Sequence, residues 1–479
     1  MAITRIFLWL SFALMFYAGL MLATAVGGLI LGEMRQAKLF FMLACLAAVG
    51  GMIIYYTSQN SVRRESPRDA LIFLVLFWVF IPVITALPYL LSSGLGPQAW
   101  VMSYFESVSA ITTTGASTLV PEVIPRTLLL WRAALQWSGG CIVATFAVVV
   151  FAAINLDGTG VHKSVLFTLQ RGELFSRLVS IGWKITLLYG AIAALCILLL
   201  FGFGTPLFDA ICLGLSAVST GGFTPRSGPL ASYVNNLGGL VLALTCILGA
   251  MNVSIIWDLL RRRNRNSLRE TFANVEHRGL LMIVSILIIF GFIYTGPTHI
   301  ITVFFESIFM ATTAGFDYHV IGIDIIPPSL LIALVLIGGS ALSTAGGLKI
   351  IRMLLLFRHL RTDLDRMSHP SRVMPVKFEG EIVPDKAFLS VWMYFFGYTL
   401  VFALGIMALG AAGLDFKIAV AACASTLSNM GPLLAATNPE TSYGDMNSLE
   451  LAVLTIIMII GRVEVLAAFA IISPSFWRR

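Results

Sequence analysis

Ten long apolar runs restrict what this 479-residue chain can fold into. They lie near residues 6–31, 39–57, 70–91, 128–154, 178–203, 237–260, 280–296, 329–357, 387–412 and 449–473. A helix needs about 20 apolar residues to cross a bilayer. Only 11% of the residues are charged and 58% are hydrophobic, whereas a soluble domain carries about 25% charged residues. The sequence therefore predicts an all-α polytopic membrane protein and excludes a water-soluble or disordered one.

The basic residues indicate how the spans are oriented. Of the 31 Lys and Arg residues, 24 lie near the termini or in the segments 58–69, 155–184, 261–279 and 349–386. Because cytoplasmic loops carry the excess of Lys and Arg, we expect both termini and these segments on the cytoplasmic side. The net charge of +7 then follows from topology, so we expect membrane lipids as partners and no nucleic acid. The first run is interpreted as a span, although residues 23–25 resemble a signal-peptidase site.

A fourfold repeat is the most informative pattern in the chain. Four shorter apolar runs, near 100–114, 206–221, 299–314 and 416–430, end in Thr, Ser and Gly clusters and are too short to span. Each lies between two long runs, and its key glycine is Gly115, Gly222, Gly315 or Gly431. The predicted units are two N-terminal spans over 1–60, then pore repeats over 61–160, 161–265, 266–370 and 371–479.

Four re-entrant loops on one side of a membrane predict a central pore on a pseudo-fourfold axis. A cation entering it loses water, so backbone carbonyl oxygens must replace that water. Glycine adopts the positive φ that helps to turn carbonyls inward. The hydroxyl groups of Thr113, Thr220 and Thr313 could add ligands at the inner end. A single such loop would be only a surface turn, and the prediction depends on the four copies together.

Two features inside the apolar runs have alternative interpretations. The pairs Gly338-Gly339 and Gly346-Gly347 interrupt the run 329–357, where they either unwind the helix or allow close helix packing. Arg462 lies inside the run 449–473, where a charge is costly and usually functional. It could instead form a structural ion pair with Glu464 or another carboxylate.

Several acidic residues lie near the four short runs. We expect Glu106, Asp209 and Glu306 to cap the short helices, although they could also attract cations to the pore mouth. Asp317 is an alternative cation-attracting charge at the outer side. The six cysteines and six histidines show no metal-ligand spacing, so no metal site is expected beyond the ion pathway.

The four loops, the stretch Gly338–Lys349 and the motif Gly461-Arg462-Val463-Glu464 resemble the membrane subunit of Trk-type potassium transporters, in the Trk/Ktr/HKT superfamily. The resemblance covers nearly the whole chain, and the two extra N-terminal spans are similar to the TrkH-like branch. It implies a potassium-binding filter with K⁺ as bound ion and substrate, and no cofactor on this chain. The implied filter strands are Thr113-Thr114-Gly115-Ala116, Thr220-Gly221-Gly222-Phe223, Thr313-Ala314-Gly315-Phe316 and Asn429-Met430-Gly431-Pro432.

The resemblance also implies how the pathway is controlled. An intramembrane gating loop would lie beneath the filter, with Arg462 facing the pore; the gating residues are Gly338, Gly339, Gly346, Gly347, Lys349 and Arg462. Gly115 favours potassium, and the fourth strand departs most from the pattern because Asn429 replaces Thr. A homodimer in the bacterial inner membrane and a cytosolic Rossmann-type nucleotide-binding regulatory subunit are expected.

These observations predict potassium uptake through a gated, channel-like pore and no enzyme activity. The chain has no Walker A motif, and its longest predicted cytoplasmic segment, roughly 358–386, is too short for a nucleotide-binding domain. The alternatives are a Na⁺- or H⁺-coupled potassium symporter and the pore subunit of an ATP-driven potassium pump. A coupled carrier is less favoured, because the copies lie on one face and few acidic residues lie within the spans.

Overall fold

The computed structural model describes residues 3–59, 67–92, 98–154, 174–262, 274–318, 326–369, 377–378, 381–383 and 385–463. These residues are almost entirely helical, which confirms the predicted fold class. The exception is an antiparallel hairpin of two short strands, β1 (Lys377–Phe378) and β2 (Glu381–Ile382). Several residues used to predict topology or pairing lie outside the described ranges, namely Arg63, Arg64, Lys163, Arg171, Arg263, Arg265, Arg269, Arg372, Glu464, Arg478 and Arg479.

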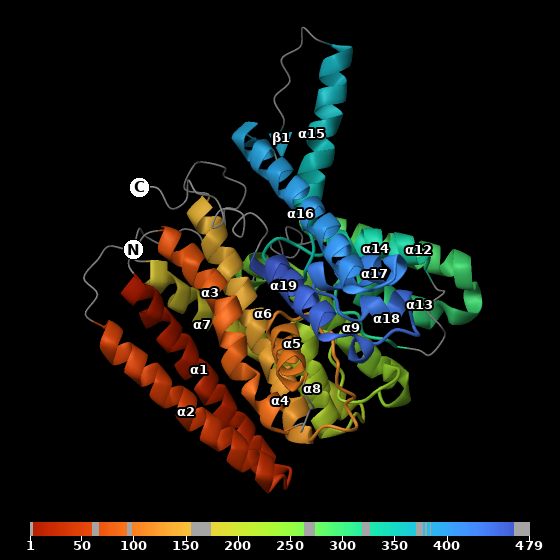
Figure 1. Ribbon diagram of the computed structural model, residues 1–479. Coiled ribbons are helices and arrows are strands. Elements are labelled where there is room, and N and C mark those ends of the chain that lie inside the picture. The colour runs from red at the N-terminus through yellow and green to blue at the C-terminus, as the bar shows by residue number, and fades with distance from the viewer. Residues whose placement is uncertain are drawn as a thin grey trace.

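The first two helices form an antiparallel hairpin beside the rest of the molecule. Helices α1 (Ile3–Ile30) and α2 (Met34–Ser58) are drawn in red at one side of Figure 1. Large aromatic side chains of α1 pack toward the next unit, and the rings of Trp9 and Phe73 meet edge to face at 5.4 Å. Burial of such aromatic surface holds the hairpin against the core.

The rest of the chain contains four successive units with the same order of elements. Each unit has a long helix, a short helix, an irregular loop and a second helix. The first two units comprise α3 (Pro67–Thr85), α4 (Leu87–Ser92), α5 (Ala99–Ile111) and α6 (Arg126–Ile154), then α7 (Leu174–Gly202), α8 (Leu207–Val218), α9 (Asn236–Ala250) and α10 (Val253–Arg262). The last two comprise α12 (Val275–Thr295), α13 (Ile300–Ala311), α14 (Pro328–Ile337) and α15 (Ile350–Ser368), then α16 (Asp385–Ala412), α17 (Phe416–Leu427), α18 (Leu433–Thr437) and α19 (Ser448–Val463).

The short helices α5, α8, α13 and α17 form the interior of the molecule. They contain only 12 or 13 residues, about 18–20 Å of helix, whereas the hydrocarbon core is about 30 Å thick. The last three residues of each short helix are buried, and Figure 1 shows α5 and α8 among the longer helices. The loops that follow them are thereby brought to the centre of the structure.

Two apolar runs that were predicted as full spans are not single straight helices. In the run 237–260, α9 and α10 meet at an angle of 105°. Asn252 causes this break, because its side-chain oxygen accepts hydrogen bonds from the amide and hydroxyl of Ser254 and so caps a new helix. The run 329–357 is interrupted between Ile337 and Ile350, so the unwound interpretation of its glycine pairs is correct.

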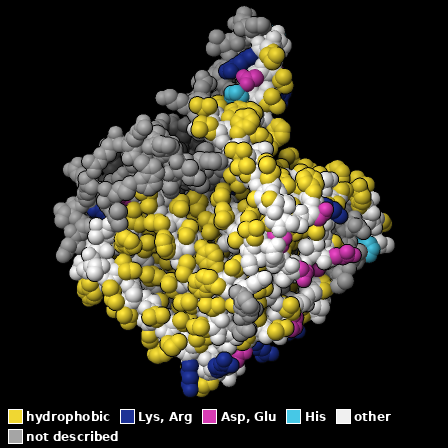
Figure 2. All heavy atoms as spheres, viewed as in Figure 1, with side chains coloured by type: hydrophobic (Ala, Val, Ile, Leu, Met, Phe, Trp, Pro, Cys, Tyr) yellow, Lys and Arg dark blue, Asp and Glu magenta, His cyan; other side chains and the backbone are white. Residues whose placement is uncertain are grey.

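The surface of the helical body is largely apolar. Figure 2 shows hydrophobic side chains across it, with charged side chains gathered at its lower and right edges and on the projecting helix. On α2 alone, Phe41, Leu46 and Ile53 are each more than half exposed. Among the described residues, six helices are long and apolar enough to cross a membrane, or seven if the bent pair α9–α10 counts as one.

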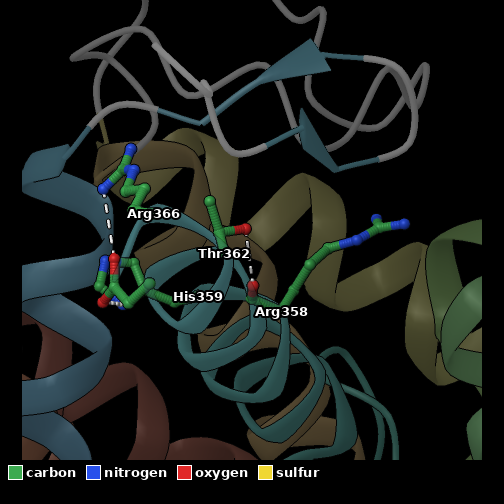
Figure 3. A network of polar contacts seen from close by, with 5 residues as sticks. Arg358, His359, Thr362 and Arg366 are labelled. Carbon is green, nitrogen blue, oxygen red and sulfur yellow. Dashed lines mark hydrogen bonds and ion pairs between the residues drawn. The ribbon is translucent and has the colours of Figure 1, made fainter. Parts of the chain in front are cut away.

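Helix α15 extends away from this body (Figure 1). Its distal part carries charged residues between the exposed side chains of Leu360, Leu364 and Met367. Contacts within the helix stabilise it, as Figure 3 shows for His359, Thr362 and Arg366. Asp363 lies 3.0 Å from the ring nitrogen of His359 and 3.2 Å from the Arg366 guanidinium. Pairs three and four residues apart stabilise a helix without tertiary packing.

Candidate functional site

All four short helices end in the same left-handed turn. The second residue after each helix has a positive φ of 48–58°. These residues are Thr113, Thr220, Thr313 and Asn429. The left-handed region costs a non-glycine residue about 1–2 kcal/mol, and such strain is concentrated at functional sites. Asn429 therefore aligns the fourth loop with the other three, although the sequence analysis expected positive φ only at glycine.

The next residues place the four strands around one centre. Beside each key glycine, an added Cβ would touch or overlap a neighbouring strand. The successive contacts are Gly115 with Gly221, Gly222 with Ala314, Gly315 with Pro432 and Gly431 with Ala116. Each strand thus contacts the next, and the fourth contacts the first. The four loops form a closed ring, which is the arrangement that a central pathway requires.

The four strands are not equivalent in how their carbonyl oxygens are used. The Thr114 carbonyl accepts from the Gly431 amide at 2.5 Å, and the Gly221 carbonyl accepts from the side-chain amide of Gln136 at 2.6 Å. The Gly431 carbonyl accepts from the Tyr443 hydroxyl at 2.9 Å. Gly431 also lacks the positive φ of the other three filter glycines. The carbonyl oxygens of Thr114, Gly221 and Gly431 therefore accept hydrogen bonds from protein groups, and the fourth strand differs most from the other three.

At the inner end of the ring, each of the four residues with positive φ forms a hydrogen bond through its side chain. Four of the five partners lie on α19 or on the linker 338–349 between α14 and α15. The pairs are Thr113 with Arg462, Thr220 with Thr344 at 3.1 Å, Thr313 with the Gly346 amide at 3.0 Å, and Asn429 with Thr114 at 3.0 Å and the Met458 carbonyl at 3.1 Å. The inner end of the ring is thus closed by protein groups.

The linker 338–349 folds back on itself directly beneath the ring. Every residue in it is buried. Gly338 and Gly347 have φ of 72° and 79°, and an added Cβ on either would meet backbone of the other end of the linker. An added Cβ on Gly346 would overlap the Ser428 carbonyl, and Gly339 donates to the Gly346 carbonyl at 3.4 Å. The glycine pairs therefore allow the backbone to pack against itself and against the fourth loop.

The corner between α9 and α10 holds the linker from the side. Ser340 and Thr344 donate their backbone amides to α9 carbonyls at 3.2 Å, and the Val253 amide donates to the Leu342 carbonyl at 2.8 Å. The buried carboxylate of Glu276 accepts from the Ala341 amide at 3.2 Å. The 105° bend is therefore part of the site, because it supplies the backbone groups that the linker needs.

Arg462 connects the first strand with the linker. Its guanidinium donates to the Thr112 carbonyl, the Thr113 hydroxyl and the Thr344 carbonyl, the last at 2.8 Å. The alternative partner Glu464 lies outside the described residues. Within the described part of the chain, these hydrogen bonds go to neutral oxygens of the site.

A cavity of about 50 Å³ lies beside the linker. Apolar residues such as Trp78 line it together with Ser343, Lys349 and Arg462. Lys349 has a strained φ of 79°, and its ammonium group donates to the Ala345 carbonyl at 2.5 Å. Two basic side chains in a small cavity disfavour a cation there.

The three acidic residues that were predicted as helix caps have other positions. Glu106 and Glu306 lie within α5 and α13, where each accepts a hydrogen bond from the backbone amide twelve residues later, at 2.5 and 2.6 Å. They tie the outgoing strand to its own helix. Asp209 lies in the first turn of α8 and pairs with Arg226 at 2.6 Å. Asp317 is exposed just after the third strand, and its role stays a prediction.

The sequence analysis missed two residues of α6, Arg132 and Gln136. Both are buried, and both donate hydrogen bonds to the second loop. Arg132 could have been found by the argument that singled out Arg462, since it is also a charge inside an apolar run. Gln136 carries no comparable signal, because a neutral side chain inside an apolar run does not stand out as a charge does.

Comparisons with known proteins agree with this geometry. The family described as TrkH, cation transport protein, matches residues 35–478. The Trk system potassium uptake protein TrkH of Salmonella typhimurium is 30% identical and is matched over 100% of this chain and 99% of that protein. The corresponding TrkG of Escherichia coli is 31% identical, over 98% of this chain and 97% of that protein. The crystal structure of the potassium transporter TrkH from Vibrio parahaemolyticus covers 100% of both chains, with a TM-score of 0.87 and 26% identity. The chain therefore belongs to the TrkH family of cation transport proteins and is a multi-pass membrane protein.

Proposed function

We propose that this chain takes up potassium through a gated, channel-like pathway at the centre of the four-strand ring. The observation that carries the proposal is the closed ring with four left-handed residues at its inner end. The relatives named as potassium uptake proteins support K⁺ as the ion. K⁺ is both substrate and bound ion in this proposal, and the carbonyls of Thr114, Gly221 and Gly431 accept protein hydrogen bonds beside it. The filter residues around the ion are Thr113, Thr114, Gly115, Thr220, Gly221, Gly222, Thr313, Ala314, Gly315, Asn429, Met430 and Gly431.

The linker 338–349 and Arg462 act as the gate in this proposal. Their hydrogen bonds to Thr113, Thr220 and Thr313 occupy the hydroxyl groups that would otherwise face an ion leaving the filter. Opening the pathway therefore requires the linker to withdraw, and its four glycines supply the backbone freedom. Lys349 and Arg462 add an electrostatic barrier while the gate is closed.

The protein acts as a transport subunit and not as an enzyme. We place it in the bacterial inner membrane with both termini cytoplasmic, as the distribution of basic residues suggests. A homodimer that binds a cytosolic Rossmann-type nucleotide-binding subunit fits the naming of the relatives as Trk system proteins. The distal part of α15 exposes both charged and apolar side chains and is available to such a partner.

Ion flux into liposomes tests the proposal directly. The purified full-length chain should let K⁺ enter potassium-free vesicles without ATP, and Na⁺ should enter more slowly. Uptake that requires an imposed Na⁺ or H⁺ gradient would favour the coupled symporter. Uptake that requires ATP and a second protein would favour the pump subunit. No K⁺ flux, together with no growth rescue of a potassium-uptake-deficient bacterium that also carries a regulatory subunit, would refute the proposal.

A further inference from the structure

One face of α6 runs along the boundary between the first and second filter strands. Arg132, Gln136 and Gly140 lie four residues apart and therefore on the same face of the helix. Arg132 and Gln136 donate to the second loop, while an added Cβ on Gly140 would approach Ser219 at 2.8 Å. This face contacts the second loop from its inner end to its outer end.

Gln136 fixes the orientation of one filter carbonyl. Its side chain is fully buried, and its amide nitrogen donates to the Gly221 oxygen at 2.6 Å. An added Cβ on Gly221 would overlap the same amide group, so the strand lies directly against it. A carbonyl that accepts this hydrogen bond is withheld from an ion in the pathway. Glycine at 221 is therefore required by the approach of Gln136.

Arg132 joins the two strands one turn further out. It is 2% exposed and donates to the Ser117 hydroxyl at 3.1 Å and to the Thr224 carbonyl at 3.0 Å. Its guanidinium lies 4.3 Å from the centre of the Phe223 ring. Ser117 in turn donates to the buried carboxylate of Glu106 at 2.9 Å. The positive and negative charges are thus linked through one hydroxyl group, which couples strand one to strand two.

The other units that can be aligned do not repeat this arrangement. Three glycines occupy equivalent places, because an added Cβ on each would overlap the carbonyl of the last residue of its unit's short helix. They are Gly139, Gly249 and Gly461. We compare the residues three and seven positions before each of these glycines. They are Gln136 and Arg132 in the first unit, Cys246 and Leu242 in the second, and Met458 and Leu454 in the fourth. The two polar side chains are therefore particular to the first unit among these three.

We propose that Arg132 and Gln136 are positioning residues that determine the ion specificity of the second filter strand. The inference rests on the proposed potassium pathway. They hold the Gly221 carbonyl away from the ion and fix strand two against strand one. Strand two therefore cannot move inward and narrow the ring. A ring that contracts would accommodate the smaller Na⁺ better, so releasing the strand lowers the preference for K⁺.

The experiment compares K⁺ and Na⁺ flux in liposomes for variants of the full-length chain. Gln136→Leu removes the donor at similar volume and should lower the K⁺ over Na⁺ ratio by roughly three- to tenfold, the equivalent of one hydrogen bond. Arg132→Gln should lower it as much. Arg132→Lys keeps the charge without the two-pronged geometry and should restore the ratio only in part. Arg126→Gln, which removes an exposed charge at the start of the same helix, is the matched control and should leave the ratio unchanged.

A second measurement separates selectivity from general damage. For each variant in detergent, we would determine the K⁺ and Na⁺ concentrations that give half of the maximal thermal stabilisation. If Arg132→Gln does not fold, the K⁺ over Na⁺ ratio of Gln136→Leu alone decides whether the inference holds. An unchanged ratio in Gln136→Leu, by flux or by stabilisation, overturns the inference while leaving the potassium pathway intact. A wild-type chain that neither conducts K⁺ nor is stabilised by it overturns the proposed function and, with it, this inference.

Discussion

At the scale of single residues, Gly115 has no room for a side chain. Its φ is 78°, and an added Cβ would overlap the Gly221 carbonyl. Gly115→Ser should therefore push strands one and two apart. The backbone strain at this position is on the order of 1–2 kcal/mol, so the K⁺ over Na⁺ ratio in liposome flux should fall by about tenfold.

Gly204 offers a control for backbone strain alone. It also has a positive φ, of 95°, but an added Cβ there would meet nothing within 4 Å. Gly204→Ser should reduce thermal stability and leave ion preference unchanged. If both serine variants kept the wild-type ratio, Gly115 would not belong to the filter.

In the proposed closed gate, Arg462 donates three hydrogen bonds that an alanine cannot replace. Removing a charged donor from a buried site destabilises the closed state relative to the open state by about 2 kcal/mol. Arg462→Ala should therefore raise basal K⁺ flux by roughly thirtyfold. Arg462→Lys retains the charge and should show a smaller increase. Lower flux at full protein recovery would indicate that Arg462 supports the open pathway instead.

Glu122 joins the first and second loops at the outer surface. Its carboxylate accepts from the Ser227 amide and hydroxyl, each at 2.6 Å, and this hydrogen bonding lowers the pKa of Glu122. A lowered pKa means that the link stabilises the fold above the unfolded pKa of about 4.3 and is lost as the pH falls through the folded pKa. The melting temperature should therefore differ between wild type and Glu122→Gln at pH 7 and converge as the pH falls below the lowered pKa of Glu122. A difference that does not depend on pH would contradict this assignment.

At the scale of elements, the α9–α10 corner should control the linker without touching the filter. Asn252→Ala removes the cap of α10, which costs about 1 kcal/mol, and loosens the backbone that binds residues 340–344. Basal K⁺ flux should rise roughly fivefold with an unchanged K⁺ over Na⁺ ratio, as measured in the same liposome assay.

Asn235 provides the matched control, since it caps α9 by accepting from the Gly238 amide at 2.8 Å. Asn235→Ala should lower stability by a similar amount without raising the flux. Equal flux increases in both variants would show that the effect reflects general destabilisation and not the corner.

The short helices and the linker show which elements were predictable from sequence. Four apolar runs of about fifteen residues, each ending in a Thr, Ser or Gly cluster, had to be re-entrant, because their length excludes a full span. The glycine pairs likewise indicated a break in the run 329–357. The bend at Asn252 was missed, because the run 237–260 is apolar on both sides of a single capping residue.

Within the site, the loops were predictable but their hydrogen bonds were not. Repetition located Gly115, Gly222, Gly315 and Gly431, since each copy supported the others. The repeat could not indicate that Gly431 donates to Thr114, or that Gln136 binds the Gly221 carbonyl, because those contacts join segments distant in sequence. The left-handed threonines were also missed, as that conformation is imposed by surrounding packing against their own preference.

At the scale of the whole molecule, Glu33 fastens the N-terminal hairpin to the first unit. Its carboxylate accepts from the backbone amides of Arg126 and Thr127, both at 2.9 Å, at the start of α6. A negative charge there stabilises the helix by about 1 kcal/mol. Glu33→Gln should lower the melting temperature in detergent, with the K⁺ over Na⁺ ratio unchanged. Glu440→Gln, an exposed carboxylate between α18 and α19, should change neither quantity; a shift in selectivity from Glu33→Gln would mean that the hairpin acts on the filter.

The presence of all four strands in one chain has a consequence for how ion preference can evolve. In a tetramer of identical subunits, one codon change alters four positions of the ring at once. Here Asn429 differs from its three counterparts, and the pair Arg132 and Gln136 acts on the second strand and on its junction with the first. Mutation can therefore adjust one quadrant at a time, so that a lineage can pass through intermediate selectivities while each step remains functional.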